Sequence, residues 1–171
     1  TLPYATTALN AANGYRSIGD YESSKKYYSI VEEIYLKTLS WDDMLLAGLY
    51  NNISLLYQEF SDYRKAMDYL LKALEIVIAQ KADFEIAVTY ANLANTAVLE
   101  KDYEKAKDYA MRAIACFDKM KLYDAHYCAA LSALGMCFYA GHAYEEASSY
   151  FEKAMKIVHD MFGENSQYQR L

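Results

Sequence analysis

Four segments share one pattern: Gly19-Asp20-Tyr21-Glu22, Ser61-Asp62-Tyr63-Arg64, Lys101-Asp102-Tyr103-Glu104 and His142-Ala143-Tyr144-Glu145. Their tyrosines lie 42, 40 and 41 residues apart. The third residue after each tyrosine is small, in turn Ser24, Ala66, Ala106 and Ala147. A period of this length predicts a chain built from stacked copies of one supersecondary unit, each of which buries its apolar face against the next.

An apolar stripe precedes each of these segments, with members 3, 4 and 7 residues apart, the spacing of one face of an α-helix. The four stripes are Ala8/Ala11/Ala12/Tyr15, Tyr50/Ile53/Ser54/Tyr57, Tyr90/Leu93/Ala94/Ala97 and Leu131/Leu134/Gly135/Phe138. A second apolar helix follows each segment, so every unit is predicted to be a helix, a tight turn and a helix. Asp43, Asp83 and Asp124 recur where the first helices should begin. A carboxylate at a helix start accepts hydrogen bonds from N–H groups that have no partner in the helix, and it interacts favourably with the positive end of the helix dipole.

The predicted repeats cover residues 1–40, 41–80, 81–121 and 122–162 of a single solenoid over 1–171. The last residues, 163–171, fall one period after the start of the fourth first helix, so we expect them to open a fifth unit or to form a partial cap. The small residues that follow the turns allow close helix crossing. The chain is expected to be a fragment of a longer protein or to end in that cap.

This pattern resembles the tetratricopeptide repeat (TPR) family over about 160 residues. The resemblance rests on the small residue at the first-helix contact (Ala94, Gly135), the aromatic residue near the end of that helix, and the Tyr-x-x-Ala signal after the turn. The period is longer than the usual value of about 34 residues, as in the longer variants of kinesin light chain. The resemblance implies an all-α, right-handed superhelical solenoid of helical hairpins whose first helices line a concave groove.

Composition narrows the functional classes. The chain has 171 residues, 54% of them hydrophobic, and a formal net charge of −6. Acidic charge argues against a sequence-independent nucleic-acid ligand, and no apolar run is long enough to span a membrane. The three cysteines, Cys116, Cys128 and Cys137, have no metal-ligand spacing and are interpreted as small buried hydrophobes in a reducing compartment. We therefore expect a cytoplasmic location.

Catalytic and cofactor signals are absent from the sequence. His126, His142 and His159 form no zinc-binding pair, and there is neither a phosphate-binding loop nor a nucleophile elbow. Paired carboxylates such as Glu32-Glu33 are interpreted as solvated helix faces. The chain is therefore predicted to be no enzyme and to hold no cofactor or metal.

Asparagines recur in the first helices at positions that packing does not use. One row is Asn10, Asn52 and Asn92, and three residues on come Asn13 and Asn95, with Asn51 beside them. Asparagine is a weak helix former, so its recurrence favours a role. Each amide offers donors and an acceptor to the backbone of an extended peptide, and such a row resembles the asparagine ladders of kinesin-light-chain repeats. Arg16, Gln58 and Tyr139, about two turns further on, are candidate contacts for ligand side chains. The alternative is that the amides bond neighbouring helices or solvate a polar surface.

One TPR subclass binds acidic C-terminal tails through two asparagines and three basic residues. Asn13 and Asn52 match its asparagines, but Leu9, Val88 and Asn92 stand at its basic positions. An acidic carboxylate would lack its counter-charges, so this ligand is rejected. The preferred hypothesis is a scaffold that binds an extended peptide or helix of a partner protein. The alternatives are a sensor domain of a bacterial regulator that responds to a signalling peptide, and a self-association module giving a homo-oligomer.

Overall fold

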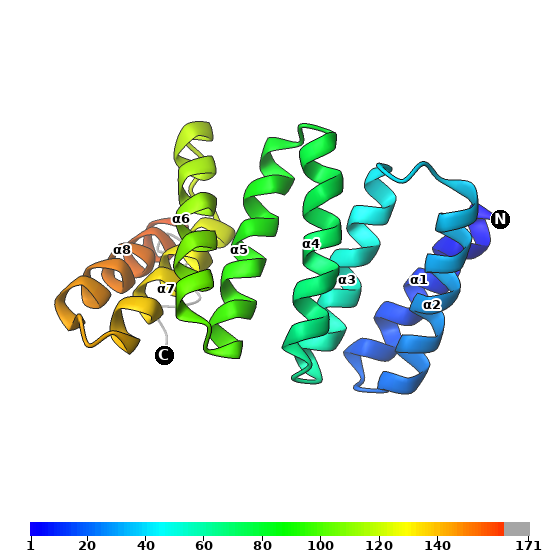
Figure 1. Ribbon diagram of the computed structural model, residues 1–171, viewed down its shortest axis with the longest axis horizontal. Coiled ribbons are helices and arrows are strands. Elements are labelled where there is room, and N and C mark those ends of the chain that lie inside the picture. The colour runs from blue at the N-terminus through cyan, green and yellow to red at the C-terminus, as the bar shows by residue number, and fades with distance from the viewer. Residues whose placement is uncertain (163–171) are drawn as a thin grey trace. The chain divides into compact units, whose positions relative to one another are not determined.

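Helices form all of the regular structure in residues 1–162, the part of the chain that the computed structural model describes (Figure 1). In chain order they are α1 (Leu2–Ser17), α2 (Tyr21–Thr38), α3 (Met44–Glu59), α4 (Tyr63–Ala79), α5 (Asp83–Glu100), α6 (Tyr103–Met120), α7 (Ala125–Ala140) and α8 (Tyr144–Phe162). Each successive pair is an antiparallel hairpin within one predicted repeat range. The prediction of an all-α helical repeat solenoid is confirmed. The right-handed superhelical sense stays a prediction.

Aspartates set the helix starts. The carboxylates of Asp20, Asp62 and Asp102 accept hydrogen bonds from the backbone N–H three residues on, at 3.1, 3.2 and 3.2 Å. Asp43 caps α3 by accepting from the Leu45 N–H two residues on, and Asp124 caps α7 by accepting from the His126 and Tyr127 N–H groups. Each cap occupies an N–H that the helix leaves unpaired, which typically stabilises the protein by about 1 kcal/mol. Asp83 is instead the first residue of α5.

The tight turns inside the hairpins share one backbone conformation. Gly19, Ser61, Lys101 and His142, the first residues of the four repeated segments, have φ of 77°, 61°, 64° and 62°. This left-handed conformation favours glycine, yet glycine occupies only the first turn. Two residues later the second helix begins. The repeated segment therefore specifies both the turn that reverses the chain and the start of the second helix.

The helix crossings are closed by small residues, as the sequence predicts. Ala66, Ala106 and Ala147 are at most 2% exposed. Ser24 takes their place in the first hairpin, where its buried hydroxyl donates to the Ala12 carbonyl at 2.9 Å. A polar side chain is tolerated there because its donor is satisfied within the crossing.

The chain divides into two compact units, Thr1–Ala82 and a second that begins at Asp83. Unit 1 holds the α1/α2 and α3/α4 hairpins, which meet through α2 and α3. Unit 2 holds the α5/α6 and α7/α8 hairpins, where α7 packs on both α5 and α6. Its core includes Ala113, Phe117, Tyr127 and Leu131, each at most 1% exposed.

Candidate functional site

Unit 1 carries four of the predicted amides on its two first helices. Asn10 and Asn13 lie on α1, where Asn10 is exposed and Asn13 half-buried, and Asn51 and Asn52 are half-buried on α3. The side chains of Asn10 and Asn52 form no hydrogen bond with another described residue, whereas Asn51 already has an interaction partner in the chain. Asn52 is therefore the unit 1 amide that combines partial burial with unused donors and acceptors.

A polar network ties the end of α1 to α2 and α3. The Arg16 guanidinium donates to the Glu59 carboxylate at 2.5 Å, and the Tyr28 hydroxyl donates to the Asn13 amide oxygen at 2.5 Å. Burial acts to lower the pKa of Arg16, but Glu59 and Tyr28 together raise that pKa above its ordinary value. Arg16 is thus a permanent cation held within unit 1, and Asn13 keeps only its amide N–H donors for a ligand. Gln58 also has an interaction partner in the chain.

Unit 2 carries the other two amides. Asn92 and Asn95 are both half-buried on α5. Asn92 already has an interaction partner, while the Asn95 side chain forms no hydrogen bond with a described residue. On α7 the exposed Met136 occupies the position of Asn95, the exposed Tyr139 lies three residues further on, and the Tyr139 ring lies 5.4 Å from that of Tyr144. Unit 2 therefore offers amides on one first helix and an apolar, aromatic surface on the next.

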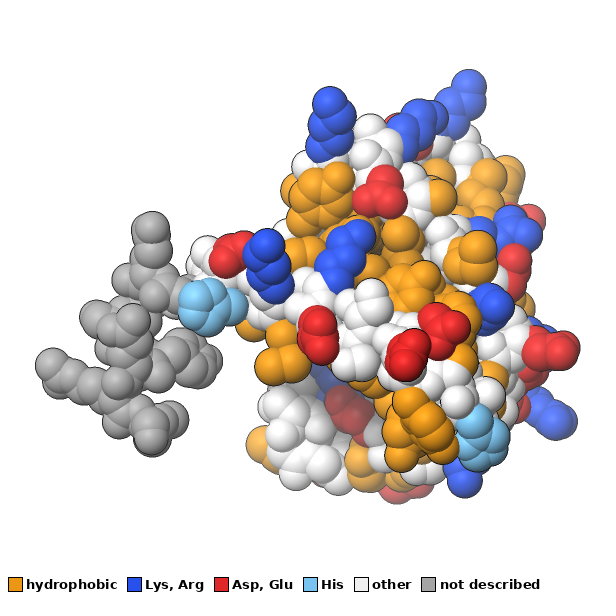
Figure 2. Space-filling view, turned by 90° about the vertical axis from the view of Figure 1, so that its left-hand side faces the viewer, with side chains coloured by type: hydrophobic (Ala, Val, Ile, Leu, Met, Phe, Trp, Pro, Cys, Tyr) orange, Lys and Arg blue, Asp and Glu red, His pale blue; other side chains and the backbone are white. Residues whose placement is uncertain are grey.

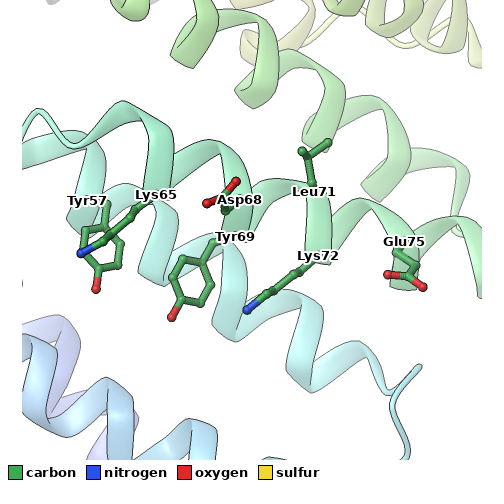
Figure 3. Close-up of a pocket in the computed structure, with 7 residues that line it drawn as sticks. All are labelled: Tyr57, Lys65, Asp68, Tyr69, Leu71, Lys72 and Glu75. Atoms are coloured by element: carbon green, nitrogen blue, oxygen red, sulfur yellow. The ribbon is translucent and has the colours of Figure 1, made fainter.

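A second surface, which sequence reasoning missed, lies along α4 in unit 1 (Figure 3). Tyr57 of α3 and Tyr69 of α4 stack with ring centroids 5.7 Å apart, and Tyr50 continues the row at 5.7 Å from Tyr69. The Lys65 ammonium lies 5.2 Å from the Tyr57 ring, and Lys72 lies 4.8 Å from the Tyr69 ring. Figure 3 shows the ends of the Tyr57, Tyr69, Lys65 and Lys72 side chains on one side of α4, with Asp68 and Leu71 pointing away. They line a hollow of about 530 Å³.

The charges around this tyrosine row are balanced. Burial, with a contribution from the nearby Glu32 carboxylate, raises the pKa of Tyr69 to about 12. The phenol is therefore neutral at physiological pH and remains a hydrogen-bond donor. Lys65 is within 3.7 Å of the Asp62 carboxylate, and Asp68 and Glu75 also line the hollow. The row can stack on apolar or aromatic groups, but it has no surplus of positive charge with which to select an anion.

The histidine, cysteine and carboxylate side chains of residues 1–162 are the candidates for metal binding and for nucleophilic chemistry. No three His, Cys, Asp or Glu side chains among them are arranged to hold a metal ion. Burial raises the pKa of the Cys116, Cys128 and Cys137 thiols, which keeps them protonated and weakly nucleophilic. The three histidines are exposed.

The sequence pattern of tetratricopeptide repeats matches residues 4–79 and 85–160, which is most of the chain and both units. The chain belongs to the tetratricopeptide repeat family. TPR domains are in general non-catalytic interaction modules. No curated protein matches the chain as a sequence relative.

Solved structures share the fold of this TPR chain. BtubC from P. vanneervenii has a TM-score of 0.80 and 19% identity, over 93% of this chain and 65% of its own. The nearly identical TPR-like repeats of a putative kinesin light chain from P. anserina have a TM-score of 0.75 and 16% identity, over 92% of this chain and 76% of their own. A Rap protein complexed with Competence and Sporulation Factor has a TM-score of 0.72 and 22% identity, over 91% of this chain and 42% of its own. The chain thus spans about two-fifths of the Rap protein. Identities this low establish the shared TPR fold alone.

No helix among the described residues combines the length and the apolar character that a membrane crossing requires.

Proposed function

We propose that this TPR chain is a non-catalytic protein–protein interaction scaffold that binds an extended peptide or a helix of a partner through its first helices. The observation that carries the proposal is that α3 and α5 each carry half-buried amides, and that the side chains of Asn52 and Asn95 form no hydrogen bond with another described residue. A half-buried amide is partly desolvated already, so a ligand that bonds with it displaces little ordered water.

Amides suit a ligand whose backbone is recognised before its side chains. An asparagine side chain donates to a peptide carbonyl and accepts from a peptide N–H, so it fits an extended chain of any sequence. Selectivity would then come from Met136 and Tyr139 on α7, which present an exposed thioether and an exposed ring. The expected partner is an extended segment that offers backbone groups to these amides and an apolar side chain to Met136 and Tyr139.

A sensor role is the second candidate, and a specific similarity favours it. The Rap protein with a similar fold was crystallised in complex with Competence and Sporulation Factor, so this type of helical array is found in a protein that binds such a factor. The present chain spans 42% of that protein, so an output function would belong to residues outside the compared region. Self-association of the chain is the third candidate.

The test is to select a binder from a random peptide library and to compare its affinity for the wild-type chain and for Asn52→Ala/Asn95→Ala. We expect an affinity loss of about tenfold, because two hydrogen bonds together contribute about 1–3 kcal/mol. Thermal unfolding should be unchanged, since neither side chain bonds within the described fold. The matched control is Ser149→Ala, which truncates one exposed hydroxyl on the second helix α8 and should leave the affinity unchanged. The proposal fails if no peptide binds or if the affinity ignores Asn52 and Asn95.

A further inference from the structure

The tyrosine row of hairpin α3/α4 has one ring more than the other hairpins use. Tyr50, Tyr57 and Tyr69 occupy three positions that recur with the spacing of the repeats. The other described hairpins have aromatic residues at only two of these positions, and each pair packs with ring centroids 5.5, 6.2 and 5.4 Å apart. Among the described hairpins, α3/α4 therefore has the complete row. The other three sets are Ala8/Tyr15/Tyr27, Tyr90/Ala97/Tyr109 and Leu131/Phe138/Tyr150.

The side chains that face a ligand over this row are hydrogen-bond donors. Tyr57 and Tyr69 are half-buried, and their hydroxyls form no hydrogen bond with another described residue. The raised pKa of Tyr69, about 12, keeps its phenol protonated. Figure 3 shows both hydroxyls on the same side of α4 as the ammonium groups of Lys65 and Lys72. An ammonium group donates hydrogen bonds and accepts none, and a neutral phenol donates one.

The carboxylates at the hollow lie to its sides. Asp68 points away from the row, and Glu75 lies beyond Lys72 along α4 (Figure 3). On the other side, α2 adds Lys25 and Glu32, one charge of each sign. A ligand that lies over the rings must therefore supply acceptors, and no net charge favours an anion among the ligands that can do so.

We propose that the tyrosine row of α3 and α4 binds a proline-rich segment of a partner protein in the polyproline II conformation. Proline has no backbone N–H, so such a segment brings carbonyl acceptors to a surface of donors and leaves no donor of its own without a partner. Its backbone forms no internal hydrogen bonds, so the carbonyls are free to accept from the phenols and the lysines. Its prolyl rings pack on aromatic side chains, and the conformation exists before binding, which lowers the entropy lost.

Other ligand classes fit the row less well. A ligand ammonium group is excluded because Lys72 already lies 4.8 Å from the Tyr69 ring and 5.5 Å from the Tyr50 ring. An ordinary extended peptide presents an N–H group at each residue, and these groups find no acceptor over the rings. The segment must also come from outside the 171 residues, because Pro3 is the only proline among them.

This site is independent of the amide site proposed above. Tyr50 and Tyr57 are seven residues apart and share one face of α3. Asn52 lies about 200° from Tyr50 and about 140° from Tyr57 around the helix axis, so it faces away from the row. The two sites also differ in chemistry, because an amide both donates and accepts.

The chain also has an apolar surface without a tyrosine row, which serves as an internal control. Figure 2 looks onto the α7/α8 end of the chain and shows hydrophobic side chains gathered across that face, with charged side chains around them. An open hollow of about 790 Å³ there is lined by Phe151, Met155 and Val158, among others, and Met155 is 70% exposed. A ligand attracted by apolar area alone would bind this face in preference to the tyrosine row.

The probe is a synthetic ten-residue polyproline peptide, and the measurement is its Kd by isothermal titration calorimetry. Tyr57→Phe/Tyr69→Phe keeps both rings and removes both hydroxyls. We expect this variant to bind about tenfold more weakly, as for two lost hydrogen bonds. Its thermal unfolding should be unchanged, because neither hydroxyl bonds within the described fold. Asn52→Ala/Asn95→Ala should bind polyproline as the parent chain does.

The matched control is Tyr15→Phe/Tyr27→Phe, the same double change in hairpin α1/α2, where Ala8 replaces the third ring. This variant and Met155→Ser should both keep the parent affinity. The proposal is overturned if polyproline does not bind, if Tyr57→Phe/Tyr69→Phe binds it unchanged, or if either control loses as much affinity. Equal or tighter binding of a ten-residue Gly-Ser or polyglutamate peptide would also overturn it, since the row would then accept any backbone or select an anion.

Discussion

The two hairpins of unit 2 fill the same helix crossing in opposite ways. In α5/α6, Ala94 of the first helix faces Ala110 of the second, and both are 0% exposed. In α7/α8, one period later, the first helix has Gly135 and the second has Phe151. A Cβ added to Gly135 would lie 2.8 Å from Cε1 of Phe151, which is closer than two carbon atoms can approach. Glycine on the first helix thus leaves room for a large side chain on the second, so the residues suited to the two positions depend on each other.

The aromatic pairing beside the crossing differs in the same two hairpins. Phe138 stacks on Tyr150 at 5.4 Å and 13° in α7/α8. In α5/α6 the buried Ala97 replaces the first ring, and Tyr109 packs instead on Tyr90 at 6.2 Å and 30°. In hairpin α5/α6, small residues therefore fill the helix crossing. Its aromatic contact lies at Tyr90, at least one helical turn before Ala97. Each hairpin is a complementary set, so a residue transplanted between them should fail unless its partner moves too.

The largest effect is expected from Ala110→Phe, which introduces into the α5/α6 crossing the phenylalanine that the α7/α8 crossing has at Phe151. The ring has no space against Ala94, so the free energy of unfolding should fall by about 3 kcal/mol, the upper part of the range for overpacked cores. Adding Ala94→Gly should recover part of this loss, although Ala94→Gly alone costs about 1 kcal/mol of helix propensity. Urea denaturation of the two single variants and the double variant measures the coupling. Additive losses would show that the two positions do not share one volume.

Gly135→Ala is the converse change and should have an intermediate effect. The new methyl group must push the Phe151 ring aside, while alanine improves helix propensity by about 1 kcal/mol. We expect a net loss of about 1 kcal/mol, within the range for overpacking, because Phe151 lines the open hollow on α8 and can shift outward. In a Phe151→Leu background the same substitution should become stabilising. Thermal unfolding of the four chains decides this, and a loss that persists beside leucine would mean that the methyl group meets something else.

The smallest effect is expected at Lys107, whose ammonium contacts the Phe138 ring. Hairpin α5/α6 has Ala97 in place of that ring. The Lys107 ammonium lies 4.9 Å from the centroid of the Phe138 ring, and a cation over an aromatic face at an exposed site contributes about 0.5–1 kcal/mol. Lys107→Met should therefore destabilise the chain by about 0.5 kcal/mol and have no effect in a Phe138→Leu background. Lys156→Met, at an exposed position of α8, controls for the lost charge. Equal effects of both lysine changes would remove the ring contact from the comparison.

The local features of the fold could be predicted from the sequence because they are encoded within a few residues of one another. The caps at Asp20, Asp62 and Asp102 depend on a carboxylate three residues from an N–H group, and the crossings at Ala66 and Ala106 depend on residue size at a fixed offset. Both signals repeat with the period, so each copy supports the interpretation of the others.

Contacts between hairpins were not predictable in the same way. The ion pair of Arg16 with Glu59 joins residues 43 positions apart, and the hydrogen bond from the Tyr21 hydroxyl to the Glu59 carbonyl joins residues 38 positions apart. Such pairs depend on how far one helix slides along another, which composition and period do not determine. Arg16, predicted to contact a ligand, is found in an ion pair within unit 1. The amides of Asn52 and Asn95 remain predicted binding residues, and the tyrosine row along α4 entered only with the structure.

The joints between hairpins bear on how the array can change over evolutionary time. Lys81 and Lys121, which follow α4 and α6, both have φ of 52°, and an aspartate begins the next helix two or three residues later. Leu39 after α2 is extended, with φ of −109° and ψ of 156°. A genetic duplication bounded by residues 81 and 121 would therefore begin and end in one backbone geometry and could be inserted without a new linker. Copy number can thus vary at these joints independently of which ligand the hairpins bind, whereas the joint after α2 would resist it.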